Sequence, residues 1–407
     1  MEKKFLEFTH LLSKNRPIWE NEPLDLYPFH LDSFPVDWVK QLSTLSDEKL
    51  YLFEGKEQYQ YVQDPQLQSL LLEISQLCQV PKMLSPQSHQ LDQFAFHGVK
   101  AKKRHELEHL VPIMVQIIKD HQLKGVVDIG SGLGHLSQAL ARYYKIPTTC
   151  IESNPLLKTK AQKRIRRPYK IDYPLTQYLQ ADLNLQSSEL TAQLKGPILN
   201  FGLHTCGELA VVQMQLATRY CSKAILNFGC CYHRIKSNQF FNISSLAKTD
   251  GLMLTPASLT LAAKAHKNLT LKEFLFRQRV KSYRYGLDQL LKKEFALTHA
   301  YSVGPSSEEL YYRPFSVYCA EQLKRLKLKP TLTEKAVNSF YQIDRLAQER
   351  TELMSCGIIR SFFGRLLEFY LLYDRALYLQ ENRYQAEVKS YFNRHISPRN
   401  IGIFASL

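Results

Sequence analysis

The sequence lacks several features that mark particular protein classes. It has no apolar run of about 18 residues or more, so it predicts no membrane-spanning helix. Its first residues, Met1 to Phe5, lack the apolar core of a secretory signal peptide. The eight cysteines are irregularly spaced, which does not fit a disulfide framework and favours a reducing compartment. Without repeats or low-complexity linkers, the 407 residues suggest a cytoplasmic globular protein of two or three domains.

Acidic residues are scarce relative to basic ones. The chain has 38 Asp and Glu against 53 Lys and Arg, a net charge of +15, which favours a polyanionic partner such as nucleic acid. Basic residues gather in the segments 158–170, 267–285 and 324–329, and the second segment interleaves them with Phe274, Phe276, Tyr283 and Tyr285. Basic residues with aromatic side chains between them predict RNA binding. The alternative is that these are ordinary solvated helix faces.

One stretch, from Val126 to His135, combines an apolar run, an acid and a glycine-rich turn. The run ends at Asp128, and a helical pattern follows the turn. This is the strand, turn and helix that hold a nucleotide in an α/β fold, because glycine lets the backbone bend sharply and approach a ligand closely. Glu152 and Asp182 follow the next two candidate strands. A doubly wound domain that binds another nucleotide, or no ligand, is the alternative.

Candidate strands alternate with helical patterns through the middle of the chain, which predicts a parallel α/β sheet. The strands are expected at 125–130, 148–152, 176–180, 197–203 and 223–228. We expect a helical N-terminal region over 1–105, a core over 106–260, a helical cap or insertion over 261–390, and a C-terminal strand within 391–407 that completes the sheet.

Two unusual polar groups follow the fourth and fifth strands. Ligands bind beyond the carboxyl ends of parallel strands, and neighbouring strands bring their ends together. The residues expected to converge there are His204, Cys206, Cys230, Cys231, Tyr232 and His233.

The glycine-rich turn and the motifs after the fourth and fifth strands resemble those of a known family. The Asp-x-Gly-x-Gly-x-Gly turn resembles the first motif of class I S-adenosylmethionine (SAM) methyltransferases. From about residue 95 onward the chain resembles the methyltransferase-like protein 25 family, which includes the ribosomal RNA adenine dimethylase domain-containing relatives. The matching words are Lys102–Glu106, His204–Gly207, Gly229–Tyr232, Tyr373–Arg375, Tyr378–Glu381 and Ser397–Asn400.

The resemblance implies a Rossmann-like class I methyltransferase fold with SAM as cofactor. Asp128 is then expected near the SAM ammonium, Glu152 on the ribose hydroxyls and Asp182 near the adenine. The full set expected to bind SAM is Asp128, Gly130, Ser131, Gly132, Gly134, His135, Glu152, Asp182 and His204.

A fainter similarity reaches tRNA 2′-O-methyltransferases that carry a Cys-Cys-His-His word. This chain has Cys230-Cys231-Tyr232-His233 in that place. The Asn/Asp-Pro-Pro-aromatic word of adenine-N6 methyltransferases is replaced by His204-Thr205-Cys206-Gly207, which disfavours that chemistry.

Each candidate residue has a functional and a structural interpretation. His204 and His233 are candidate general bases, but His204 could instead hold its turn through hydrogen bonds. Cys206 could line the site or pack, and Tyr232 could stack on a base or pack. These four form the predicted catalytic set. The predicted substrate-binding set is Lys102, Lys103, Arg104, Cys230 and Cys231.

No metal site is assigned, because the cysteine spacing lacks a Cys-x-x-Cys pair, although the donors would suffice for zinc. We therefore expect a SAM-dependent methyltransferase that acts on RNA, either tRNA or ribosomal RNA. The alternatives are methylation of a protein, such as a ribosomal protein, and a non-catalytic module that binds SAM together with RNA or protein.

Overall fold

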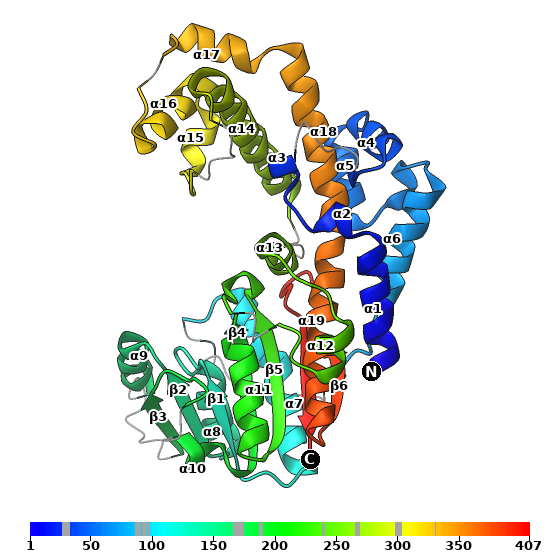
Figure 1. Ribbon diagram of the computed structural model, residues 1–407. Helices are drawn as coiled ribbons and strands as arrows, with labels where there is room; N and C mark the ends of the chain where they lie inside the picture. Colours follow the sequence, from blue (N-terminus) through cyan, green and yellow to red (C-terminus); the bar gives the residue numbers. More distant parts are fainter. Residues whose placement is uncertain are drawn as a thin grey trace. The chain divides into compact units, whose positions relative to one another are not determined.

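Figure 1 shows the computed structural model, which describes residues 1–26, 33–85, 91, 96, 98–165, 175–186, 190–237, 241–264, 269–297, 303–329 and 331–407. The chain forms two compact units. Unit 1 contains residues 1–13, 77–268 and 365–407, and unit 2 contains residues 14–76 and 269–364. The segments 1–105 and 261–390 therefore each contribute to both units. Within the described ranges, no helix has the length and apolarity needed to span a membrane.

The sheet lies in unit 1 and has seven strands in the order β3-β2-β1-β4-β5-β7-β6. The strands are β1 (Gly125–Ile129), β2 (Thr148–Glu152), β3 (Thr176–Gln180), β4 (Gly196–Cys206), β5 (Ser222–Cys230), β6 (Gln385–Ser390) and β7 (Ile401–Ser406). The strands β1 to β5 pair in parallel, and β7 pairs antiparallel with both β5 and β6. The predicted α/β Rossmann-like methyltransferase fold is confirmed (Figure 1).

Unit 1 also contains helices, some of which pack on the sheet. They are α1 (Glu2–Lys14), α7 (Ala101–Asp120), α8 (His135–Tyr144), α9 (Pro155–Ile165), α10 (Thr191–Leu194), α11 (Leu209–Arg219), the 3-10 turn η5 (Tyr232–Arg234), α12 (Ser245–Asp250), α13 (Pro256–Lys264) and α19 (Phe363–Glu381). Apolar side chains of α7 and α8 pack against one face of the sheet. This face includes Phe201 of β4 and Phe228 of β5. Side chains alternate along a strand, so the neighbouring residues of β4 and β5 face the other side.

That other face carries a buried polar cluster beneath α11. Gln213 of α11 donates to Asn200 of β4 at 3.0 Å and accepts from Asn227 of β5 at 2.6 Å. A Cβ on Gly202 would lie 2.2 Å from the Gln213 side-chain oxygen, so glycine is required there. The cluster joins α11 to β4 and β5. These are the two strands whose carboxyl ends were expected to carry the converging histidine, cysteine and tyrosine residues.

The C-terminal segment completes the sheet as a hairpin. Ile403 of β7 pairs with Asn227 of β5, so the last strand lies in the core sheet. Strand β6 was not predicted, because it falls in the segment expected to be helical. Only Ala386 and Val388 are buried in β6, and a short edge strand with two buried residues gives a weak pattern.

Two acids of α19, the buried Asp374 and the exposed Glu381, accept hydrogen bonds from backbone N–H groups around the start of α12. Asp374 accepts from the backbone N–H groups of Ile243 and Ser244, both at 2.9 Å. Glu381 accepts from the Ser245 N–H at 2.7 Å. These N–H groups lie at and before the start of α12, where a helix leaves backbone donors unpaired, so the acids cap a helix.

Unit 2 is helical in its described residues. Its elements are α2 (Arg16–Trp19), α3 (Pro23–Leu26), α4 (Val36–Ser43), α5 (Asp47–Lys56), η2 (Tyr59–Tyr61), α6 (Pro65–Leu77), α14 (Leu271–Phe295), α15 (Glu308–Tyr312), α16 (Phe315–Arg325), α17 (Glu334–Tyr341) and α18 (Asp344–Ser361). Its core holds stacked aromatic rings, such as Phe315 on Tyr341 with centroids 4.2 Å apart.

Candidate functional site

The predicted glycine turn follows β1 directly. Gly130, Gly132 and Gly134 have φ values of 66°, 59° and 66°, the left-handed region that glycine adopts without strain. The Gly130 N–H donates to the Ile151 carbonyl at 3.0 Å, and the Gly134 N–H donates to the Ser131 carbonyl at 2.9 Å. The turn is therefore hydrogen-bonded to β2 at its start and has an internal hydrogen bond just before α8 begins.

The last two glycines of the turn have different surroundings. A Cβ on Gly134 would lie 2.4 Å from the Tyr178 hydroxyl, which itself accepts from Gln138 at 2.8 Å. A Cβ on Gly132 would meet no described atom within 4 Å. Gly134 is thus required by packing against β3, whereas Gly132 leaves its backbone uncovered, as a close approach by a ligand requires.

Glu152, at the end of β2, is linked to this uncovered backbone. Its carboxylate accepts from the Gly132 N–H and from the Asn154 N–H, each at 2.9 Å. Each carboxylate oxygen retains a second lone pair that can accept another hydrogen bond. Asp182 is exposed beyond the end of β3, and Ser131 and His135 are partly buried on either side of the turn. The structure therefore brings the predicted cofactor residues to one edge of the sheet.

Asp128, the acid of the motif, is 4% exposed and accepts a 2.6 Å hydrogen bond from Ser137. Burial raises the pKa of this carboxyl to about 6, although the Ser137 hydrogen bond and the positive charge of Lys103 act in the opposite direction. The charge on Asp128 is thus only partly compensated within the protein. A cation beside it would complete the compensation.

His204 ends the predicted fourth strand in a left-handed conformation, with φ of 61°. Its Nε2 lies 2.8 Å from Oε1 of Glu106, a residue of α7. Because an ionised carboxylate only accepts hydrogen bonds, Nε2 is the donor in this pair, which leaves Nδ1 as the ring nitrogen that could take up a proton. His204 is 26% exposed, so the ring is held from one side and reaches solvent on another.

Glu106 is the main site residue that the prediction missed. It is 1% exposed and accepts from Ser397 at 2.8 Å, and the Lys102 and Lys103 ammonium groups each lie 3.6 Å from it. Burial opposes its ionisation, but the His204 hydrogen bond and nearby positive charges outweigh burial and lower its pKa to about 2. One signal was present in the sequence: this acid follows two lysines at helical spacing.

The basic residues before Glu106 have different surroundings. Desolvation lowers the pKa of Lys103, against the attraction of the Glu106 and Asp128 carboxylates, so this lysine links the two acids electrostatically. Lys102 keeps 47% of its side chain exposed. Arg104 pairs with Glu108 at 2.8 Å and lies over the Phe96 ring. Lys102 and Arg104 are the two most accessible to solvent, since the Arg104 side chain is 56% exposed.

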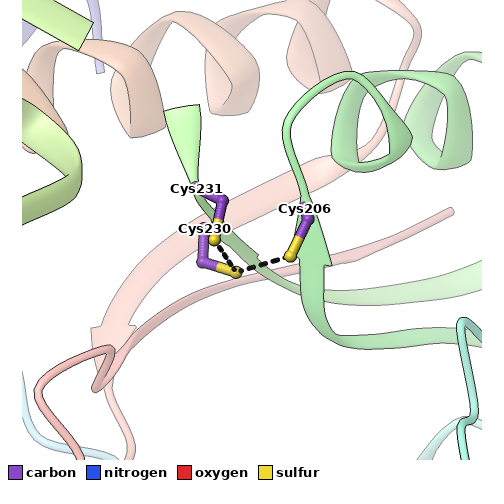
Figure 2. Close-up of side chains that lie close together, drawn as sticks. All are labelled: Cys206, Cys230 and Cys231. Atoms are coloured by element: carbon purple, nitrogen blue, oxygen red, sulfur yellow. Dashed lines mark hydrogen bonds between the residues drawn. The ribbon is translucent and has the colours of Figure 1, made fainter. Parts of the chain in front are cut away.

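Figure 2 shows the three cysteines brought together at the ends of β4 and β5. The Cys206 and Cys230 sulfurs are 3.4 Å apart, and those of Cys230 and Cys231 are 3.7 Å apart. Hydrogen bonding from Cys230 lowers the pKa of Cys206 to about 5, against the effect of burial. The same contact and burial raise the pKa of Cys230. Of the six residues expected to converge, the ends of β4 and β5 bring these three cysteines together.

Tyr232 and His233 do not share one environment. Tyr232 is fully buried, and the guanidinium groups of Arg375 and Arg399 lie 5.0 and 5.8 Å from the centroid of its ring. No face of this ring is accessible to a substrate base, so its surroundings favour the packing interpretation over stacking. His233, the next residue, is exposed.

The three basic segments also differ. In the second segment, Phe274, Tyr283 and Tyr285 are buried in unit 2, so these rings cannot stack on RNA bases. Arg277 pairs with Glu54, and Arg279 donates to the Tyr311 carbonyl at 2.5 Å. Exposed lysines remain in all three segments, namely Lys160, Lys163, Lys272, Lys324, Lys327 and Lys329. Arg166, Arg167, Lys170 and Lys267 lie outside the described residues.

Comparisons with known proteins agree with this geometry. Residues 102–238 match a family described as "Methyltransferase domain". The human "Probable methyltransferase-like protein 25" is 26% identical over 253 residues, which cover 57% of this chain and 40% of the human protein. The mouse protein of the same name is 26% identical over 233 residues, or 53% of this chain and 37% of the mouse protein. The match thus spans about two fifths of these curated relatives.

The matched residues contain the glycine turn, Glu106, His204 and the cysteine cluster. Residues 102–238 therefore form a methyltransferase domain, and the resemblance to the methyltransferase-like protein 25 family is confirmed.

Proposed function

We propose that the chain is a SAM-dependent methyltransferase that acts on RNA. The observation that supports SAM most strongly is the uncovered backbone of Gly132 between the ends of β1 and β2, with Glu152 hydrogen-bonded to it. Asp128 is a buried acid suited to a cationic ligand, because its own charge is only partly compensated. The residues proposed to hold SAM are Asp128, Gly130, Ser131, Gly132, Gly134, His135, Glu152 and Asp182.

Bound SAM would supply a sulfonium methyl group, whose transfer requires the acceptor atom to be held in line with the carbon–sulfur bond. The carboxyl-terminal part of β4 provides the group to remove the acceptor proton. We assign this role to Nδ1 of His204, since Nε2 donates to Glu106. Glu106 is a positioning residue, because its buried carboxylate orients the imidazole and stabilises the ring after it gains a proton.

RNA is the proposed acceptor because the chain carries a net charge of +15 and keeps exposed lysines on α9 and after α16. The partial similarity of Cys230-Cys231-Tyr232-His233 to the Cys-Cys-His-His motif of tRNA 2′-O-methyltransferases also favours RNA, either tRNA or ribosomal RNA, as the acceptor. The irregular spacing of the eight cysteines favours a reducing compartment such as the cytoplasm.

The test is transfer of labelled methyl from SAM to total cellular RNA and to total protein, with wild type and Gly132→Arg. An arginine at this position would occupy the space that the glycine leaves open. Gly196→Arg is the matched control: this glycine also has a positive φ and no atom near its Cβ position, but it begins β4 at the opposite edge of the sheet.

Label on RNA that is lost in Gly132→Arg and kept in Gly196→Arg supports the proposal. Label on protein alone would contradict the proposal that RNA is the acceptor, but it would still support methyl transfer. SAM binding without label in either fraction would favour a binding module over an enzyme.

A further inference from the structure

We propose that Cys206, Cys230 and Cys231 form a binding site for one Zn²⁺ ion. The proposal goes beyond methyl transfer and does not depend on it. Figure 2 shows the three thiols at the ends of the neighbouring strands β4 and β5. Thiolates are soft ligands that bind Zn²⁺ strongly, and three of them from a fixed framework can form most of its coordination shell.

The distances between the sulfur atoms fit this ion. Sulfurs bound about 2.3 Å from one zinc ion in tetrahedral geometry lie about 3.8 Å from one another. The observed separations are 3.4 Å for Cys206 and Cys230 and 3.7 Å for Cys230 and Cys231, and no pair of the three exceeds 4.8 Å. Small side-chain rotations would place all three sulfurs at ligand distance.

The backbone holds the cysteines in this arrangement. Cys206 and Cys230 are direct neighbours in the register of β4 and β5, and the Gly207 N–H donates to the Cys230 carbonyl at 2.8 Å. Successive side chains of a strand point to opposite faces, so adjacent cysteines would ordinarily diverge. Cys231 instead has a left-handed φ of 52°, and its sulfur lies beside that of Cys230.

The left-handed conformation at Cys231 is unfavourable for a residue with a Cβ, and such conformations concentrate at functional sites. A sharp turn alone would be satisfied more easily by glycine. A cysteine at this position is explained if its sulfur must meet the other two.

The charges around the cluster also suit the ion. Three thiolates and one Zn²⁺ carry a net charge of −1. The positive charge of Arg234 acts on Cys206 and Cys231, so it would offset this charge. Cys230 is 6% exposed, whereas Cys206 and Cys231 are partly exposed, which leaves a route for the ion.

The described residues offer no fourth His, Cys, Asp or Glu ligand in this cluster. Zinc sites with three protein ligands keep their fourth position for water or a substrate atom, whereas structural sites are closed by four. The site is therefore of the open type. His204 is two residues from Cys206, so the open position would lie near the proposed acceptor site.

The experiment measures the metal content of the 407-residue chain after purification under reducing conditions without chelators. We expect one zinc per chain, and loss of the zinc on treatment with a strong chelator. Replacement by Co²⁺ should give thiolate-to-metal charge-transfer absorption with an intensity that fits three thiolates.

The variants are Cys206→Ser, Cys230→Ser and Cys231→Ser. Each should lower zinc affinity by more than about tenfold, since removal of a direct ligand should exceed loss of a second-shell partner. Cys221→Ser is the matched control, because Cys221 is a free, exposed cysteine with a left-handed φ of 54° beside the first residue of β5. Circular dichroism shows whether each variant is folded, and a folded variant without zinc counts as support.

Three results would overturn the proposal: no stoichiometric zinc with the thiols free, a disulfide between Cys206 and Cys230 in the purified chain, or zinc that persists in all three variants. SAM binding is measured on the same samples. Because SAM is assigned to other residues, failure of the zinc site and failure of the methyltransferase proposal would be distinguishable.

Discussion

At the scale of single residues, the two buried carboxylates of the site have opposite pKa shifts. Burial raises the pKa of Asp128 from 3.8 to about 6. The pKa of Glu106 is lowered from 4.5 to about 2 by its partners, despite burial. Glu106 therefore has its electrostatic partners within the protein. Asp128 lacks full compensation, which fits a group that awaits a cationic ligand.

This difference predicts how Asp128→Asn changes stability with pH. A carboxyl with a raised pKa stabilises the folded state below its unfolded pKa, and this contribution is lost as the pH rises through the folded value. The free energy of unfolding of Asp128→Asn, relative to that of wild type, should increase by on the order of 3 kcal/mol as the pH rises from 3.8 to 6. The variant should also bind SAM weakly. Parallel pH curves for the two proteins would contradict the assigned shift.

Glu106→Gln should behave in the opposite way. Stability from a lowered pKa is present above pH 4.5 and is lost as the pH falls towards 2. At pH 7 we expect a loss on the order of 2–3 kcal/mol in denaturant unfolding, because an amide cannot neutralise Lys103. Glu108→Gln is the control: its exposed pairing with Arg104 should contribute less than about 1 kcal/mol. Equal losses in both variants would refute the role given to Glu106.

His204→Asn tests the proposed base, because asparagine tolerates the left-handed backbone at this position. The rate of methyl transfer should fall by about 10²–10⁴-fold while SAM affinity is kept. His233→Asn changes the exposed histidine after β5 and should leave the rate nearly unchanged. If His204→Asn instead loses SAM affinity, the residue belongs to the donor site, the other role expected from the sequence.

At the scale of elements, the loop before β7 joins α13 and α19 through Arg399. Its guanidinium donates to Glu368 at 2.8 Å and to the Ala262 carbonyl at 3.2 Å, and Glu368 is 2% exposed. Arg399→Met should therefore lower the free energy of unfolding, but by less than the roughly 3–5 kcal/mol expected for a buried charge with no partner left, because Glu368 keeps its ion pair with Arg365 at 2.7 Å.

The double variant Arg399→Met with Glu368→Leu should recover much of that loss, because no buried charge then remains from this pair. If the double variant is as unstable as the sum of the two single variants, the energy lies in packing and the ion pair contributes little.

The elements that sequence predicted well are those with strong local patterns. The five parallel strands were placed nearly at their observed bounds, since each apolar run ends in an acid, a glycine or a turn. Strand β6 has only two buried residues and was missed. The pairing of His204 with Glu106 joins residues 98 positions apart, so no local pattern reveals it. The burial of Tyr232 beside Arg375 and Arg399 also arises only from tertiary packing.

At the scale of the whole molecule, the surplus of positive charge is the basis for the RNA proposal. Replacing Lys324, Lys327 and Lys329 with Gln should weaken binding to single-stranded RNA. If all three contact phosphates, the slope of log affinity against log salt should become less steep by about 2. The control replaces the scattered exposed lysines Lys3, Lys14 and Lys49, with the same change in net charge. An equal effect of both triple variants would indicate non-specific attraction.

The most direct test of the central claim is the affinity of the purified chain for SAM, measured by calorimetry. Gly132→Arg should lower this affinity by more than about 100-fold, or about 2.7 kcal/mol, because its side chain fills the open space above the turn. Gly196→Arg should bind SAM like wild type. If wild type does not bind SAM, or if both variants bind it equally well, the glycine turn after β1 is not the donor site and the proposed methyltransferase activity fails with it.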